Sequence, residues 1–282
     1  METLDSKHHD EIASLIKKMQ SPISEYSFAN LYLFRRQHDY KVLRKGDYTF
    51  LTAITYDGTR YIMPFNKIES IDKAILKELM SEGYCLFPVP ESDLVHLPES
   101  EYRYEFNDDD SDYVYTRNKI ATYPGRNLHK KRNLIKQYRT LYQYEDKPYS
   151  CDRASDAKVA LQRWFDLGGL PIEDTDYIAC VEAIDHCEAF GLVGQVYYAD
   201  GEPSGFLLGE ELNDNTFVIH FAKGVTTFKG IYAHMYNSLA NALPEKYELL
   251  NFEQDLGKES LRQAKSTYLV DNMQRKYRVH LK

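Results

Sequence analysis

Three consecutive strand patterns in the second half of the chain limit its fold more than any other feature. They cover residues 194–198, 204–210 and 216–222. The turn residues Asp200-Gly201 separate the first two, and Asn213-Asp214-Asn215 separate the last two. Because such short connections join neighbouring antiparallel strands, the sequence predicts a three-stranded meander here.

Helix patterns surround this meander, and a shorter arrangement of the same kind precedes it. Apolar spacing and end signals predict helices over 127–142, 154–167, 173–190 and 229–243, then a strand over 247–252, a helix over 258–264, and one or two strands within 268–281. The first half predicts a helix over 6–19, a hairpin of 48–56 and 60–65 around Asp57-Gly58, a helix over 71–80 and a strand over 84–89.

This element order is that of the GNAT acyltransferases, and 282 residues suit two modules. We therefore expect an α/β chain with mixed sheets, built as two tandem GNAT-like modules over residues 1–115 and 116–282. The boundary follows the acidic run 107–112, which we expect to be a solvated turn or linker.

Composition narrows the class of protein. The net charge of -8 argues against a protein that binds nucleic acid over its whole surface. Only a local basic patch could bind a nucleic acid. The four cysteines match no C-x-x-C pattern, and no metal site is expected. No signal-peptide core and no run of 18 apolar residues occurs, so we expect a cytoplasmic protein without a transmembrane segment.

Residues 126–139 form a basic segment, with six Lys or Arg and no acid. On a helix, Arg132, Lys136 and Arg139 form a basic stripe, whereas Lys131 falls on the apolar side. An inward lysine either binds an anion, such as a phosphate or carboxylate, or extends its ammonium to water. Both interpretations stay open, and the stripe is most simply a solvated face.

Residues 251–268 form a second polar segment. On a strand, Asn251, Glu253 and Asp255 would alternate onto one face. Arg262 and Lys265 would share one side of the helix that follows. The set either positions a ligand's amine and phosphate or forms a structural network of ion pairs. We expect it to share a pocket with Lys131.

The end of the third meander strand is a third candidate. His220 and Lys223 precede a loop in which Thr227, Lys229 and Gly230 are candidate cofactor-binding residues. A strand-to-helix loop offers backbone N–H groups to an anion, and GNAT enzymes bind the cofactor pyrophosphate there. A single glycine does not reproduce the Gly-rich loop of acetyl-CoA users.

Several of these segments together resemble a known family, the C-terminal domain of phosphatidylglycerol lysyltransferases, also called the DUF2156 family. The matching segments are Phe28–Leu31, Asp112–Tyr115, His129–Asn133, His220–Lys223, Lys229–Tyr232, and Asn251-x-Glu-x-Asp-x-Gly257 followed by Leu261-Arg262 and Ala264-Lys265. The resemblance implies a tandem GNAT fold, akin to the Fem-type enzymes that move an aminoacyl group from tRNA to an amine or hydroxyl. It implies a site that includes Lys131, Arg132, Asn133, Lys223, Glu253, Asp255, Arg262 and Lys265.

The sequence thus predicts an acyl or aminoacyl transferase with Glu253, Asp255 and His220 as candidate catalytic residues. Asn251 joins the substrate-binding set. The donor would be aminoacyl-tRNA or acyl-CoA, and the acceptor a small molecule, a peptide or a lipid headgroup. The tRNA acceptor end is a candidate partner, and the oligomeric state stays open. The alternatives are an acyl-CoA-dependent N-acyltransferase and a non-catalytic module that binds a nucleotide, tRNA or protein.

Overall fold

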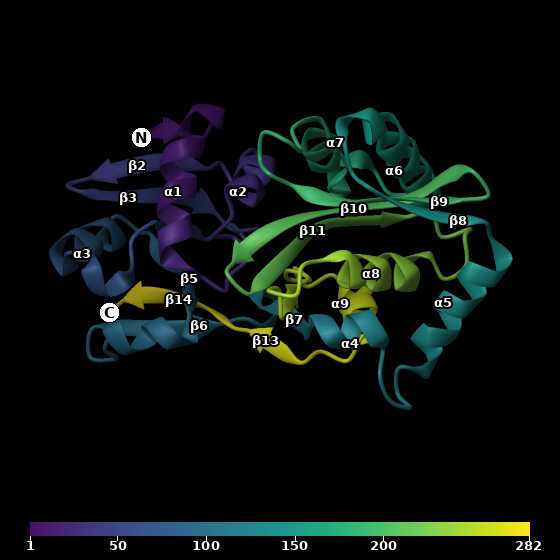
Figure 1. Cartoon of the computed structure of the whole chain (residues 1–282). Coiled ribbons are helices and arrows are strands. Elements are labelled where there is room, and N and C mark those ends of the chain that lie inside the picture. The colour runs from purple at the N-terminus through teal and green to yellow at the C-terminus, as the bar shows by residue number, and fades with distance from the viewer. The chain divides into compact units, whose positions relative to one another are not determined.

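The computed structural model describes residues 1–282, which form two compact units (Figure 1). The first unit comprises Met1–Tyr113, Glu253–Lys265 and Asn272–Lys282, and the second comprises Val114–Phe252 and Ser266–Asp271. The first segment of the first unit ends at Tyr113, two residues before the predicted module boundary after residue 115. The division differs from the expected one at the C-terminus, because most of residues 253–282 belong to the first unit.

The first unit contains one mixed sheet with helices on it. Its helices are α1 (His9–Met19), α2 (Phe28–Phe34), α3 (Lys73–Ser81) and α9 (Glu259–Ser266). The strands of this sheet are β1 (Glu2–Thr3), β2 (Lys41–Lys45), β3 (Tyr48–Ile54), β4 (Arg60–Pro64), β5 (Cys85–Pro90), β6 (Tyr102–Phe106) and β14 (Lys276–Leu281). The short strand β13 (Asn272–Gln274) belongs to the unit by its residues but not to this sheet.

The C-terminal strand β14 is an interior strand of this sheet. The strand order is β1-β2-β3-β4-β5-β14-β6, with β4 and β5 parallel and β14 antiparallel to both of its neighbours. Val279 of β14 is buried in the core that α3 forms with β3, β4 and β5 through Leu76, Phe50, Ile62 and Leu86. Burial of this apolar surface is the main favourable contribution to folding of the unit. The last residues of the chain therefore help to build the unit in which the chain begins.

The second unit is a sheet with helices on both faces. Its helices are α4 (Arg117–Thr122), α5 (His129–Leu141), α6 (Ala154–Gly168), α7 (Tyr177–Asp185) and α8 (Ile231–Ala242). Its strands are β7 (Asp112–Thr116, which starts in the first unit), β8 (Tyr144–Pro148), β9 (Val193–Ala199), β10 (Glu202–Asn213), β11 (Thr216–Gly224) and β12 (Leu249–Asn251).

The predicted meander is confirmed as β9, β10 and β11. The strands lie in the order β7-β12-β11-β10-β9-β8, and only the β11–β12 pair is parallel. In Figure 1, α6 and α7 cover one face of this sheet and α8 the other. Gly205 allows the close approach of α8, because a Cβ atom there would lie 2.8 Å from the sulfur of Met235.

The acidic run is not a solvated linker. Asp110 and Asp112 are 3% and 0% exposed, because each carboxylate forms an ion pair with a buried cation of β14. Asp110 pairs with Arg278 at 3.0 Å, and Asp112 pairs with Lys276 at 2.6 Å. Buried charges are tolerated when they are paired and hydrogen-bonded, and here the partners lie more than 160 residues away in the sequence.

Candidate active site

The segment Glu253–Gly257, called the acidic loop below, does not continue the strand as expected. Strand β12 ends at Asn251, which is fully buried, and Glu253 takes a left-handed backbone conformation with φ 59°. Leu256 and Gly257 are also left-handed, with φ of 53° and 72°. The predicted alternation of Asn251, Glu253 and Asp255 onto one strand face is therefore wrong. A left-handed non-glycine residue costs about 1 kcal/mol or more, so contacts elsewhere must hold this loop.

Asp255 is the most firmly bound residue of the acidic loop. Its carboxylate accepts from the Tyr113 hydroxyl at 2.7 Å, from the Gly257 N–H at 2.9 Å, and from the Arg262 Nε and Nη2 at 2.9 and 3.2 Å. Burial opposes the charge, but these hydrogen bonds keep the pKa of Asp255 below its usual value. Arg262 also binds Asp109 at 2.5 Å. A buried carboxylate with several donors is suited to holding the loop rather than to accepting a proton.

Glu253 is more accessible, and its contacts differ. It is half-buried, and its Oε1 accepts a hydrogen bond from the Asn30 side-chain amide at 2.9 Å. Its backbone oxygen accepts from the Tyr113 N–H at 3.1 Å and from the Lys265 Nζ at 3.0 Å. The Lys265 ammonium also donates to the backbone oxygen of Gln254 at 2.5 Å, and burial lowers the pKa of Lys265 to about 8. The Glu253 carboxylate of the acidic loop and the easily deprotonated amine of Lys265 on α9 thus belong to the same small region of the first unit.

Lys131 lies on α5 in the second unit with only neutral partners. Its Nζ donates to the Thr267 hydroxyl at 2.7 Å and lies 3.4 Å from the centre of the Tyr268 ring. Burial lowers the pKa of Lys131 to about 8, and no carboxylate lies close enough to oppose this effect. A desolvated lysine next to an aromatic face is a suitable ligand for an anion, as the first of the two interpretations requires.

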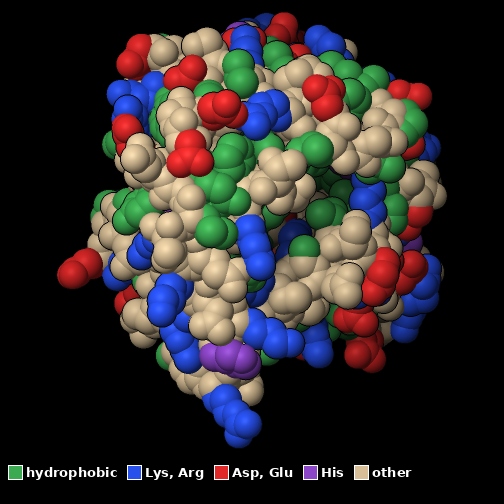
Figure 2. All heavy atoms as spheres, turned by 90° about the vertical axis from the view of Figure 1, so that its right-hand side faces the viewer, with side chains coloured by type: hydrophobic (Ala, Val, Ile, Leu, Met, Phe, Trp, Pro, Cys, Tyr) green, Lys and Arg blue, Asp and Glu red, His purple; other side chains and the backbone are tan.

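The other cations of α5 and the turn before it also lack acidic partners. Arg132 donates to the backbone oxygens of Tyr123 and Gly125, and Arg139 donates to His234 and Asn237. None of the six cations forms an ion pair; they are Arg126, Lys130, Lys131, Arg132, Lys136 and Arg139. Asn133 is exposed on the same helix. Figure 2 views the molecule from the side where α5 lies and shows Lys and Arg side chains gathered over the lower part of that face. This basic surface is available to an anionic partner.

His220 and Lys223 are both paired inside the second unit. The His220 Nε2 lies 2.9 Å from Glu210, and the Lys223 Nζ binds both carboxylate oxygens of Asp176 at 2.7 and 2.8 Å. The Lys223 ammonium also lies 4.1 Å from the Trp164 ring centre. Burial opposes the charge of Lys223, yet its surroundings, with Asp176 among them, keep its pKa above the usual value. These contacts hold both side chains in place beside β11, and their predicted roles in the site stay predictions.

The loop before α8 is closed by α5. The Lys229 N–H donates to the Tyr142 hydroxyl at 3.1 Å. Gly230, with φ 91°, lies so close to α5 that a Cβ atom there would be 2.3 Å from the backbone oxygen of Leu134. Thr227 is exposed, and its backbone oxygen also faces the Tyr142 hydroxyl at 3.5 Å. A pyrophosphate would compete here with α5 and with existing hydrogen bonds.

Residues 16–280 match the family model described as "Phosphatidylglycerol lysyltransferase, C-terminal". The chain belongs to this family. It is a family of aminoacyl-transferase domains, and the match spans almost the whole chain. A search of curated proteins finds no match.

Solved structures agree with the family assignment. A conserved protein of unknown function from Bacteroides thetaiotaomicron VPI-5482 is 27% identical, with a TM-score of 0.86, over 100% of this chain and 99% of that one. The structure of L-PGS from Bacillus licheniformis is 13% identical, with a TM-score of 0.64, over 96% and 91%. FemX is 8% identical, with a TM-score of 0.52, over 99% and 96%. The chain has a mixed α/β GNAT fold with two mixed sheets, as predicted.

The lysyltransferase-family motifs locate only part of the acidic loop's surroundings. Sequence reasoning found Glu253, Asp255, Arg262 and Lys265, but it assigned no role to Asn30, Asp109, Tyr113 or Lys276. The Phe28–Leu31 and Asp112–Tyr115 segments, which carry the family resemblance, contain two of these four residues, Asn30 and Tyr113. Lys131 and the acidic loop fall in different compact units, so their common pocket stays a prediction.

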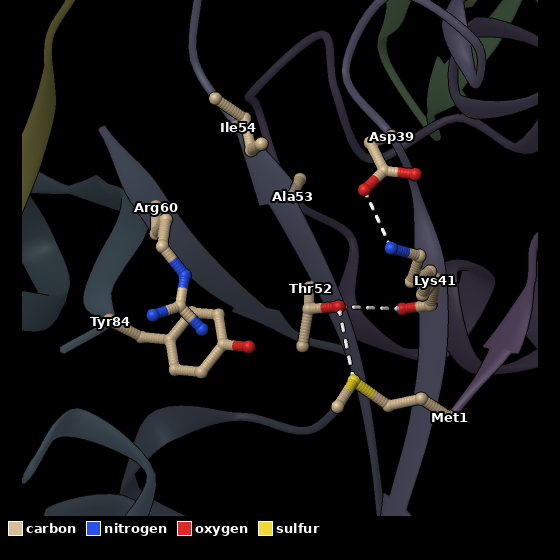
Figure 3. A pocket seen from close by; sticks show the side chains of 8 residues that line it. All are labelled: Met1, Asp39, Lys41, Thr52, Ala53, Ile54, Arg60 and Tyr84. Carbon is tan, nitrogen blue, oxygen red and sulfur yellow. Dashed lines mark hydrogen bonds and ion pairs between the residues drawn. The ribbon is translucent and has the colours of Figure 1, made fainter. Parts of the chain in front are cut away.

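A shallow hollow on the first unit contains none of the predicted residues. Its volume is about 190 Å³, and Figure 3 shows the Arg60 guanidinium over the Tyr84 ring, with 4.1 Å between them. Lys41 pairs with Asp39 at 2.6 Å at another side of the hollow. The hollow lies on the β2-β3-β4 part of the sheet and has no link to the family motifs.

No helix of this family member is both long enough and apolar enough to cross a bilayer.

Proposed function

We propose that this chain is an aminoacyl transferase that takes its aminoacyl group from aminoacyl-tRNA and passes it to an amine or hydroxyl acceptor. Membership of the lysyltransferase family supports the reaction class. The candidate acceptors are a small molecule, a peptide or a lipid headgroup.

The reaction requires one proton transfer. The acceptor nitrogen or oxygen bonds to the carbonyl carbon of the aminoacyl ester, and the bond between that carbon and the ribose oxygen of the tRNA breaks. The acceptor loses a proton, and the released ribose oxygen gains one. Glu253 is the carboxylate we assign to this transfer, directly or through water, because it is half-buried whereas Asp255 is 1% exposed. Asp255 and Arg262 hold the loop that carries it.

One observation favours tRNA over acyl-CoA as the donor. The helix α5 packs on the loop before α8, where GNAT enzymes bind pyrophosphate, and Tyr142 already occupies the Lys229 N–H. The same helix presents cations without acidic partners to solvent. A polyanionic donor can bind such a surface, because each Lys or Arg that neutralises a phosphate releases counterions.

The test is a transfer assay with the whole chain. Purified protein is incubated with tRNA charged with a mixture of labelled amino acids, and with phosphatidylglycerol vesicles, a dipeptide pool or an amino-sugar pool in turn. We expect one acceptor to accelerate loss of the aminoacyl ester, and mass spectrometry to find the aminoacylated acceptor. Glu253→Gln abolishes this turnover, whereas the exposed Glu245→Gln on the second unit leaves it unchanged.

Two outcomes would contradict the proposal and favour the alternatives. Saturable binding of acetyl-CoA in calorimetry, with acetylation of an acceptor, would support an acyl-CoA enzyme. Salt-dependent binding of tRNA without transfer to any acceptor would support a non-catalytic module.

A further inference from the structure

The acidic loop needs support from outside itself. Glu253 and Leu256 are non-glycine residues with left-handed backbones, and such conformations persist only when neighbouring contacts fix them. The internal contacts of the loop and of α9 hold its second half, through Asp255 and Arg262. In the first half, Tyr113 and Lys265 donate to backbone oxygens of Glu253 and Gln254. The side chains of Glu253 and Gln254 are in addition contacted by two side chains from distant parts of the first unit.

The first of these is Asn30 on α2. Asn30 is 6% exposed, and α2 is fixed at its start because the Ser27 hydroxyl accepts from the Asn30 N–H at 3.1 Å. All residues from Phe28 to Leu33 are buried, so the helix has little freedom to shift. The Asn30 amide donates to the Glu253 Oε1 at 2.9 Å, which selects one orientation of the carboxylate.

The second is Lys276 on β14. Its side chain is 0% exposed, and its ammonium donates to Glu25 and Asp112, at 2.6 Å each, and to the Gln254 side-chain oxygen at 3.2 Å. The Ser24 hydroxyl lies 3.3 Å from both the Lys276 ammonium and the Gln254 oxygen. Lys276 thus joins the turn before α2, the start of β7 and the acidic loop at one buried charge.

We propose that Asn30 and Lys276 are positioning residues, which set the place and orientation of the Glu253 carboxylate by holding Glu253 and Gln254 from two sides. This inference rests on the proposed function, in which Glu253 handles the proton. It gives the N-terminal half of the chain a part in catalysis, because α2 supplies one contact and the turn before α2 supplies the carboxylate and hydroxyl around Lys276.

The alternative is that these contacts only stabilise the fold. The two roles differ in what they change. A purely stabilising contact, when lost, lowers the free energy of unfolding and the folded fraction, but each folded molecule keeps its turnover rate. A positioning contact, when lost, lowers kcat in molecules that remain folded, because a displacement of about 1 Å at a reacting group can cost about a hundredfold.

The experiment uses Asn30→Ala and Gln254→Leu in the full chain. Gln254→Leu removes the link between the acidic loop and Lys276 but leaves that ammonium its two carboxylates. Asn66→Ala is the matched control, since Asn66 is a half-buried asparagine of the same unit that accepts one hydrogen bond from the Thr49 N–H at 3.3 Å. We expect both test variants to lower kcat by about tenfold or more with donor KM unchanged, and the control to change neither.

A crystal structure of Asn30→Ala gives a readout that does not depend on activity. We expect the Glu253 carboxylate to leave its wild-type place by more than about 0.5 Å, the tolerance of a preorganised site. The inference is overturned if the carboxylate stays in place, or if kcat falls only in step with the folded fraction. If the wild-type chain transfers nothing, the proposed function fails, and this crystal structure still decides whether Asn30 positions Glu253.

Discussion

Replacement of Glu25 by glutamine tests the buried charge cluster on which the acidic loop rests. Glu25 lies beside Lys276 and Asp112, and its side chain is 9% exposed. Burial is the main cause that raises the pKa of Glu25 from 4.5 to about 7; Lys276 opposes this shift, and Asp112 adds to it. One cation therefore faces two carboxylates, and the cluster favours a proton on Glu25.

The sign and size of the effect follow from this raised pKa. Between pH 4.5 and about pH 7, the folded chain retains a proton on Glu25 that the unfolded chain has lost. The contribution of Glu25 to stability is therefore fully present below pH 4.5 and is lost as the pH rises through about 7. At 1.36 kcal/mol per pKa unit, the loss amounts to about 3 kcal/mol.

Urea unfolding followed by circular dichroism, at several pH values from about 5 to about 8, measures this loss. In Glu25→Gln the side chain has the same shape and no titration, so the free energy of unfolding should fall less steeply with pH than in the wild type. Above about pH 7 the variant should be the more stable protein. If the free energy of unfolding changed equally with pH in the two proteins, the raised pKa of Glu25 would be refuted, and with it the argument that one cation faces two carboxylates.

Three further predictions concern other parts of the chain. Lys276→Met should cost about 3–5 kcal/mol of stability by urea unfolding, because it leaves two buried carboxylates without their cation; a smaller loss would mean that water reaches the cluster. Gly230→Ala should lower the melting temperature more than Gly58→Ala, since both glycines have a positive φ but only Gly230 would place a Cβ against a neighbour, 2.3 Å from a carbonyl oxygen; equal shifts would contradict the close α5 contact. In the ¹³C spectrum of the reductively methylated chain, Lys131 and Lys265 should titrate near pH 8, well below ordinary lysines, because burial disfavours their charge. If neither lysine titrated in that range, their desolvation would be contradicted.

Elements with strong local signals were predictable from sequence. The hairpin around Asp57-Gly58 and the meander β9–β11 depend on turn residues within the element itself, and both are confirmed. The helix expected over 173–190 is shorter, at Tyr177–Asp185, because turns replace both of its ends. The short helix α2 was missed, since seven residues carry too little periodicity to be recognised.

Long-range pairing was not predictable. The run 107–112 has the composition of a solvated linker, and nothing within it indicates burial. Its partners, Lys276 and Arg278, alternate along β14 and become visible only when that strand takes its place between β5 and β6. The same strand explains why the C-terminus belongs to the first unit. A block of like charges in a sequence therefore indicates a solvated segment only if no oppositely charged side chains from distant residues pair with it.

The candidate site shows the same limit at the level of single residues. Spacing within 251–268 placed two acids and two bases near one another but left open whether they bind a ligand or each other. The structure divides the set: Asp255 and Arg262 satisfy each other, whereas Glu253 takes its carboxylate contact from Asn30, 223 residues away. Burial, rather than position in a motif, therefore separates the two acids: Asp255 is 1% exposed and holds the loop, whereas Glu253 is half-buried and is the acid we assign to proton transfer.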